Sequence, residues 1–220
     1  MSLRSRPTTS AVLGVLALCA AACSGEAADP VAPIASPSEA APAPAPGDGL
    51  SVAGTAPVSP DGSLTVVILE PVGDATLEPS ETPAQMDQIN MEFLPPVVLA
   101  MVGQPVHFVN SEDILHNVRV FNIDTKETAF NISTPIGGTY EHHFDTAGTY
   151  RVACDIHPQM GASVVITTSP YAAVADRDGA FSLDNVAPGA YTALVQAGAE
   201  RSRHAVMIGD GATTLTLGGN

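Results

Sequence analysis

The stretch YEHHFDTAGTYRVACDIHPQM, residues 140–160, decides the fold. Two runs of this stretch, 140–144 and 149–154, alternate polar and apolar side chains around the turn-forming residues 145–148. Alternation with a period of two is typical of half-buried strands, and a polar turn with a glycine joins such strands into a hairpin. The sequence therefore predicts two antiparallel strands here, and the second strand ends at Cys154.

Short runs of the same kind recur on both sides of this hairpin, and no run of ten or more residues has a helical period. The further predicted strands are 63–69, 96–102, 105–109, 117–121, 162–168, 172–175, 180–183, 191–195 and 213–217. Strands at this spacing predict an all-β protein built from antiparallel sandwiches.

The composition agrees with this fold class and excludes several functions. The chain has 220 residues, 8 Lys and Arg against 23 Asp and Glu, and a formal net charge of −15. A chain this acidic repels the phosphate groups of nucleic acids, which argues against a nucleic-acid-binding function. Only 5% of residues are aromatic, whereas Gly and Pro number 19 each. That mixture indicates turns and an unstructured tract rather than a helical bundle.

The N-terminus has the pattern of an export signal. Arg4 and Arg6 precede an apolar run, 11–22, that is too short to span a bilayer. We therefore predict a signal peptide over residues 1–22. The residues Leu18-Cys19-Ala20-Ala21-Ala22-Cys23 resemble the lipobox of bacterial lipoproteins, except for Ala20 where Leu is usual. This resemblance implies lipidation of Cys23; an ordinary signal peptide cut nearby is the alternative.

The segment that follows, residues 23–49, is rich in Ala, Pro, Ser and Glu. It lacks the apolar side chains that a packed core needs, and its alternating prolines favour extended chain. We predict a disordered linker between the lipid and the folded part, with an interaction motif as the alternative. Ser24 after the cysteine is, by resemblance to sorted lipoproteins, compatible with the outer membrane.

Export also changes the charge and the thiols. Loss of Arg4 and Arg6 leaves 6 basic residues against 23 acidic ones, a net charge of −17. Of the three cysteines, Cys19 leaves with the signal and Cys23 carries lipid, so Cys154 is the one thiol left. Exported compartments are usually oxidising, and a lone thiol there is a liability. We therefore expect Cys154 to be occupied by a ligand.

Cys154 stands in a set of metal-binding side chains. His157 and Met160 follow it on the same predicted loop, and His116 lies upstream at the start of another predicted strand. Two His, one Cys and a weakly bound Met are the ligands of a blue-copper site. Thiolate and thioether favour Cu(I), and imidazole suits both oxidation states, so the set fits copper that cycles between them. A packed core cysteine or histidine is the alternative for each residue alone.

With these four residues in family order and spacing, residues 86–168 strongly resemble the cupredoxins. The short Cys-x2-His-x2-Met loop is most similar to those of amicyanin-like and plastocyanin-like proteins. The chain also resembles exported methylamine-utilisation-type proteins that join such a module to a regulatory-like tail. The resemblance implies a Greek-key β-sandwich that holds one type 1 copper ion. His116, Cys154 and His157 would be the equatorial ligands and Met160 the axial ligand.

The residues beside the ligands follow the family in part. Asn117 resembles the asparagine that ties the ligand loops together and whose backbone hydrogen-bonds the cysteine sulfur. Asp155 departs from the hydroxyl residue common after this cysteine, which leaves the hydrogen bonding near the sulfur and the reduction potential open. The remaining histidines are predicted to be structural; they are His107, His142, His143 and His204. Met86, Met91 and Met101 are predicted to pack in the interior, and the Asp176-x-Asp178-Gly179 sequence to form a β-turn rather than a calcium loop.

A second unit is predicted over residues 169–220. The sequence of 176–191 resembles the carboxypeptidase regulatory-like, transthyretin-like β-sandwich, and 51–69 looks like the opening strands of the same family. We therefore expect residues 50–85 to contribute strands that are shared with the C-terminal unit. The alternative places 63–69 in the central sandwich.

The flanks of Cys154 argue against an enzyme. Copper enzymes of this fold place His beside the cysteine to relay electrons, whereas Ala153 and Asp155 stand here. The sequence has no second His cluster and no open coordination position for a substrate. We predict a one-electron carrier. Its partner would be a redox protein with a basic docking surface, a cytochrome or a redox enzyme, steered by the acidic charge to an apolar patch near Leu115, Pro158 and 95–96.

Two alternatives remain open from the sequence. The same ligands could sequester or deliver Cu(I) at the cell envelope, or the chain could be a metal-free adhesion protein in which the C-terminal unit acts. In each case we expect a location in the periplasm or at the cell surface, with membrane contact through the lipid anchor only.

Overall fold

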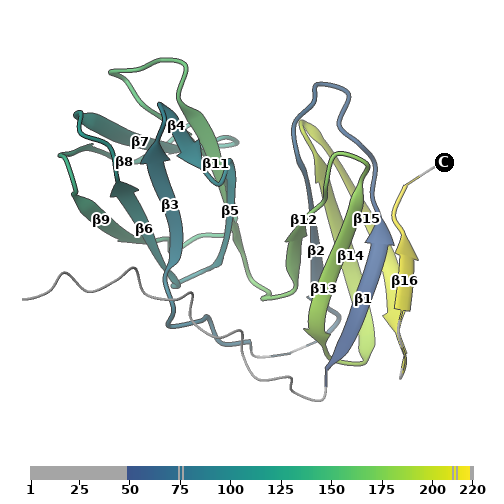
Figure 1. Ribbon diagram of the computed structural model, residues 1–220. Coiled ribbons are helices and arrows are strands. Elements are labelled where there is room, and N and C mark those ends of the chain that lie inside the picture. Colours follow the sequence, from purple (N-terminus) through teal and green to yellow (C-terminus); the bar gives the residue numbers. More distant parts are fainter. Residues whose placement is uncertain (1–48, 74, 76, 210, 212, 219–220) are drawn as a thin grey trace, which may run out of the picture. The chain divides into compact units, whose positions relative to one another are not determined.

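The computed structural model describes residues 49–73, 75, 77–209, 211 and 213–218. Within these ranges every regular element is a β-strand (Figure 1), which confirms the predicted all-β class. None of these residues lies in a helix long and apolar enough to cross a membrane. The predicted signal peptide, the predicted lipidation site Cys23 and all of the predicted linker but Gly49 lie outside the described residues.

The middle of the chain forms a sandwich of two sheets, which we call the central module (residues 84–167). One sheet has the strand order β5 (Val97–Met101), β11 (Gly161–Thr167), β10 (Gly148–Ala153), β7 (His116–Asn122) and β8 (Thr128–Thr134). The other has the order β4 (Glu92–Leu94), β3 (Ala84–Ile89), β6 (Pro105–Asn110) and β9 (Thr139–His143). Alternate side chains of both sheets meet in one apolar core that includes Phe108, Val152 and Cys154.

Most neighbouring strands of the central module are antiparallel, as expected, but two pairs are parallel. β5 pairs in parallel with β11, and β3 pairs in parallel with β6. The chain passes from one sheet to the other between these strands, so the returning strand arrives in the same direction as its neighbour. Strands β3, β4 and β8 were not predicted, because β3 and β8 carry many polar side chains and β4 has three residues.

Segments from both ends of the described chain form a second sandwich, which we call the end module (residues 50–71 and 172–217). Its first sheet has the order β13 (Ala180–Val186), β1 (Leu50–Thr55) and β16 (Thr213–Thr216). Its second sheet has the order β12 (Ala172–Val174), β2 (Thr65–Pro71), β14 (Gly189–Ala197) and β15 (Glu200–Ile208). The module has its own apolar core, which includes Val67, Leu69 and Tyr191.

One glycine of the end module shows how closely its strands approach. A Cβ on Gly54 would lie 2.5 Å from the Leu215 carbonyl oxygen and 2.6 Å from the Phe181 ring. Neither the backbone nor the buried ring has room to move. Gly54 therefore fixes the distance between β1 and the side chains packed over it.

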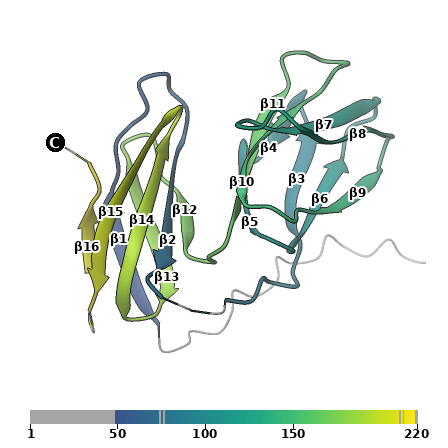
Figure 2. The same ribbon diagram turned by 180° about the vertical axis from the view of Figure 1, so that it is seen from behind.

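Strand register in the central module places the predicted metal ligands. β10 pairs with β11 from Gly148↔Ile166 to Ala153↔Gly161, and with β7 up to Ala153↔Arg119. Figure 2 shows the module that contains these three strands from behind. Cys154 therefore leaves the sheet at the point where β10 ends. The loop 154–160 is closed at its base by the last β10–β11 pair.

An aromatic cluster fills the part of the central module between β8, β9 and β10. Phe130, Tyr140, His142, Phe144 and Tyr150 lie with neighbouring ring centroids 4.5–6.4 Å apart. His142 is half-buried and its ring centroid is 4.5 Å from that of Phe130. Burial in this apolar surrounding lowers the pKa of His142 below its ordinary 6.5; Asp145 opposes the shift and His143 adds to it.

This shift predicts how the stability of the central module depends on pH. The unfolded chain takes up a proton at a higher pH than folded His142 does, so acidification from pH 7 through the lowered pKa must destabilise the fold. We expect His142→Phe, which keeps an aromatic ring, to reduce this loss. The measurement is the free energy of unfolding of both chains between pH 7.5 and 5. His143, whose pKa is raised, is present in both and cancels in the difference. A difference that does not change with pH would contradict the prediction.

Candidate metal centre

The predicted ligands come from two places in the central module. His116 is the first residue of β7 and is 0% exposed, and Cys154 directly follows β10 and is 2% exposed. His157 is half-buried on the loop 154–160, and Met160 ends that loop, buried in the same core as Cys154. β7 and β10 are hydrogen-bonded neighbours, so the first two residues meet at one end of the sandwich.

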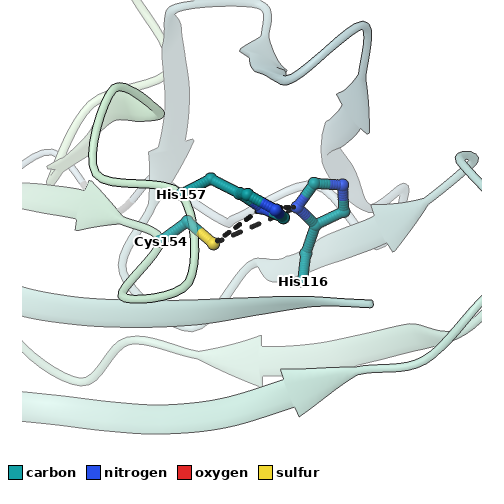
Figure 3. A group of neighbouring side chains, drawn as sticks. All are labelled: His116, Cys154 and His157. Atoms are coloured by element: carbon teal, nitrogen blue, oxygen red, sulfur yellow. Dashed lines mark hydrogen bonds between the residues drawn. The ribbon is translucent and has the colours of Figure 1, made fainter. Parts of the chain in front are cut away.

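Three donor atoms converge there (Figure 3). Cys154 Sγ lies 4.0 Å from His116 Nδ1 and 3.8 Å from His157 Nδ1, and the two Nδ1 atoms are 3.0 Å apart. In zinc sites the metal lies about 2.0 Å from imidazole nitrogen and about 2.3 Å from thiolate sulfur. Donors at those radii from one centre are about 3–4 Å from each other, so the three atoms fit one transition-metal ion. They are the one group of His, Cys, Asp or Glu ligand atoms with this capacity in the described ranges.

Met160 is brought back to Cys154 by the backbone of the loop. The Met160 N–H donates to the His157 carbonyl at 2.9 Å, and the Cys154 N–H donates to the Met160 carbonyl at 3.3 Å. These two bonds make a compact turn inside the loop, whose base is held by the β10–β11 register. The loop thus supplies two of the three converging donors, Cys154 and His157, and it ends at Met160, which is buried in the same core as Cys154.

Asn117 ties the two ligand segments together. Its Oδ1 accepts the N–H of Asp155 at 2.6 Å and the N–H of Ile156 at 3.3 Å, and the Cys154 thiol donates to the same atom at 3.4 Å. The contact to the sulfur thus runs through the side-chain amide oxygen of Asn117, whereas the family resemblance implies its backbone. One buried side chain of the β7 segment consequently fixes the first residues of the loop 154–160.

Asp155, which departs from the family pattern, takes part in the same network. Arg119 Nε donates to its Oδ1 at 2.7 Å, and Asn131 Nδ2 donates to its Oδ2 at 3.1 Å. Burial acts to raise the pKa of Asp155, but these hydrogen bonds outweigh it and the pKa lies below its ordinary 3.8. Asp155 is therefore a carboxylate held by β7 and β8, outside the donor group.

Glu112 is a residue of the site that the sequence did not single out. Its Oε2 lies 2.6 Å from His116 Nε2, and its Oε1 accepts the Met91 N–H at 3.1 Å. The only sequence signal for this contact was an acidic residue four positions before His116. That spacing alone does not indicate a contact, because Glu112 is held against His116 by Met91, 21 residues away in the turn between β3 and β4.

The other histidines lie outside the donor group. His107 and His143 both contact Glu141, at 2.8 and 3.2 Å, on β6 and β9. His142 belongs to the aromatic cluster, and His204 contacts Ser202 at 2.9 Å on β15.

The role of Asn117 gives a first prediction for the site. Asn117→Ala leaves the Asp155 and Ile156 N–H groups without their acceptor, at a cost of about 1–3 kcal/mol in the free energy of unfolding. We also expect copper affinity to fall by about 10–100-fold, as for other residues that orient ligands. Asn122→Ala, which removes a similar turn-forming asparagine at the far end of β7, is the matched control. Equal copper affinity of the two variants in a competition titration would refute the assigned role.

One protein family and several solved structures are similar to the central module. Residues 80–168 match the family described as copper binding proteins, plastocyanin/azurin family. No curated protein matches the chain. Among solved structures, a purple cupredoxin from Nitrosopumilus maritimus is 23% identical over 38% of this chain and 99% of its own, with a TM-score of 0.34. Amicyanin from Paracoccus versutus is 24% identical over 41% and 92%, with a TM-score of 0.35. The oxidised form of an amicyanin mutant is 26% identical over 46% and 98%, with a TM-score of 0.36.

The family match covers less than half of the chain and includes every predicted ligand. His116, Cys154, His157 and Met160 are the His-Cys-His-Met ligand set of a type 1 copper site. Cupredoxins of this family are small electron carriers and not enzymes, and the site is consistent with electron transfer. The central module thus matches the plastocyanin/azurin family of copper binding proteins and carries the ligand set of a type 1 copper site.

Proposed function

We propose that this protein is an exported, lipid-anchored copper protein that passes single electrons between redox partners of the cell envelope. The observation that carries the proposal is the buried convergence of Cys154 Sγ with Nδ1 of His116 and of His157. Copper, when bound, supplies the one-electron Cu(II)/Cu(I) couple. The export signal and the Cys23 anchor are proposed from the sequence pattern alone.

The protein frame suits a carrier because it holds the donors in place. The base of the loop 154–160 is fixed by strand pairing, and its first residues are fixed by Asn117. Ligands held in this way favour the same coordination geometry for Cu(II) and Cu(I), so few atoms have to move when an electron arrives or leaves. The same rigidity argues against the delivery of Cu(I), which needs the ligands to open and release the ion.

The surroundings of His157 offer a place for a partner. His157 is half-buried, whereas His116 and Cys154 are buried. Large apolar side chains are exposed on the adjoining segments: Leu115 is 51% exposed beside His116, and Ile156 is 45% exposed beside His157. We call these two residues with Ile114 the apolar patch. Asp113 is exposed at its edge. An apolar contact with an acidic residue at its edge, on a chain of strongly negative net charge, fits a weak, salt-sensitive encounter with a basic redox protein.

The first test is spectroscopic. With Cu(II) added, the chain is expected to show an intense sulfur-to-copper charge-transfer band and a narrow hyperfine splitting in electron spin resonance. Cys154→Ala should abolish both signals, whereas His204→Ala, on β15, should keep them. A pale tetragonal spectrum of the unsubstituted chain would refute the carrier proposal. Transfer of the ion to an apo acceptor faster than electron exchange would favour Cu(I) delivery instead.

The second test concerns docking. Electron transfer to a basic c-type cytochrome should slow as ionic strength rises, because the acidic surface steers the encounter. Leu115→Ala removes an exposed apolar side chain, and we expect at least about a fivefold lower second-order rate constant, which corresponds to about 1 kcal/mol. Met207→Ala, which removes a 68% exposed side chain from β15, is the control. Stopped-flow rates that are equal for both variants, at unchanged reduction potential, would exclude the apolar patch as the docking site.

A further inference from the structure

The two histidine ligands differ in what surrounds the ring nitrogen that faces away from the metal centre. His116 Nε2 lies 2.6 Å from Glu112 Oε2, and the His116 ring is completely buried. His157 is half-buried, and no carboxylate contacts it among the residues that the structure describes. The donor group therefore contains one imidazole paired with an anion and one that is not.

The proton between Glu112 and His116 has a defined place. His116 directs Nδ1 at Cys154 Sγ and at His157 Nδ1, so Nδ1 must be unprotonated to bind a metal. A neutral imidazole then carries its hydrogen on Nε2. Nε2–H consequently donates to the Glu112 carboxylate, and the short distance is typical of a charge-assisted hydrogen bond.

Glu112 is itself held in position from three sides. Its second oxygen, Oε1, accepts the Met91 N–H at 3.1 Å, and its backbone N–H donates to Asn110 Oδ1 at 3.0 Å. Asn110 is buried and donates to the carbonyls of Ile114 and Thr134. Both carboxylate oxygens are thus engaged, and the side chain is only 16% exposed. These contacts oppose rotation of the carboxylate away from His116, and its burial limits screening of its charge by water.

The Met91 contact comes from the two-residue turn that joins β3 and β4. Asn90 and Met91 have φ of 54° and 61°, the left-handed region that residues with a side chain seldom adopt. This conformation turns the chain between β3 and β4 and directs the Met91 N–H at the carboxylate. Positive φ at both central residues is what a two-residue hairpin turn requires, so the turn itself fixes the direction of this N–H.

We propose that Glu112 is a positioning residue that makes His116 an electron-rich, oriented ligand and thereby lowers the reduction potential of the copper site. This inference rests on the copper site proposed above. A carboxylate on the remote N–H raises the basicity of a ligating histidine and fixes its ring. A more basic ligand stabilises Cu(II), which has the higher charge, more than Cu(I). Glu112 therefore shifts the couple toward its oxidised form.

The test is Glu112→Gln in the full chain, which keeps the shape and a hydrogen-bond acceptor but removes the charge. We expect the oxidised-to-reduced ratio at a fixed solution potential to fall about tenfold, a rise of about 59 mV for a one-electron couple. Separate titrations should show weaker Cu(II) binding with a smaller change for Cu(I). An unchanged potential in a variant that is still blue would overturn the inference.

The matched control is Asp113→Asn, which removes one exposed negative charge from the next residue without contact to a ligand. We expect a small shift that disappears at high salt, whereas the effect of Glu112→Gln should persist. Shifts of equal size and equal salt dependence would mean that Glu112 acts only as distant charge, and would overturn the inference.

A measurement on the unsubstituted chain keeps the inference testable if the variant does not fold. In the reduced, diamagnetic protein, the His116 Nε2 proton should give a resonance that is strongly shifted downfield and exchanges slowly with water. A fast-exchanging or absent Nε2 proton would overturn the inference. Failure of the proposed function is a different result, since the unsubstituted chain would then show no blue band at all.

Discussion

Two imidazole nitrogens that face each other at 3.0 Å, with a cysteine sulfur 3.8–4.0 Å from both, set the conditions for the whole central module. Lone pairs that point at one another repel unless a cation or a proton lies between them. The free energy that gathers these groups has to come from elsewhere in the fold. The apolar core of the sandwich and the strand pairs β7–β10 and β10–β11 are its source.

Three features of the fold hold the donor atoms in place, and each restricts a different motion. Strand register fixes where His116 and Cys154 leave the sheet. Asn117 fixes the direction of the loop that follows, and Glu112 fixes the rotation of the His116 ring. His157 is half-buried whereas the other three ligands are buried, so it is the ligand nearest to solvent. Rigidity at the buried side and access at the exposed side are both needed for fast exchange of an electron with a passing partner.

The sequence was informative where the residues that form a site, or the alternating residues that form a strand, lie close together in the chain. Cys154, His157 and Met160 lie within one loop, so their spacing alone predicts a shared site, and the alternation in 140–153 predicts the hairpin before it. Strand β8 was missed because its side chains are mostly exposed or half-buried, so it lacks a clear apolar face. Strand β3 was missed because Gln88, a polar residue, is buried there through bonds to Val109 and Thr134. Glu112 could not be recognised because Met91, which orients it, is distant in sequence.

The pairing of β1 and β2 with strands from the far side of the chain also affects how the protein is made. Ile68 pairs with Ala172, and Val52 pairs with Leu183 and Thr213, so these early strands have no partners until most of the polypeptide has left the ribosome. The residues between them need no later segment to complete their own sheets. Folding during vectorial delivery must therefore finish at the two ends of the chain, where strand edges that await partners are open to chaperones and to aggregation.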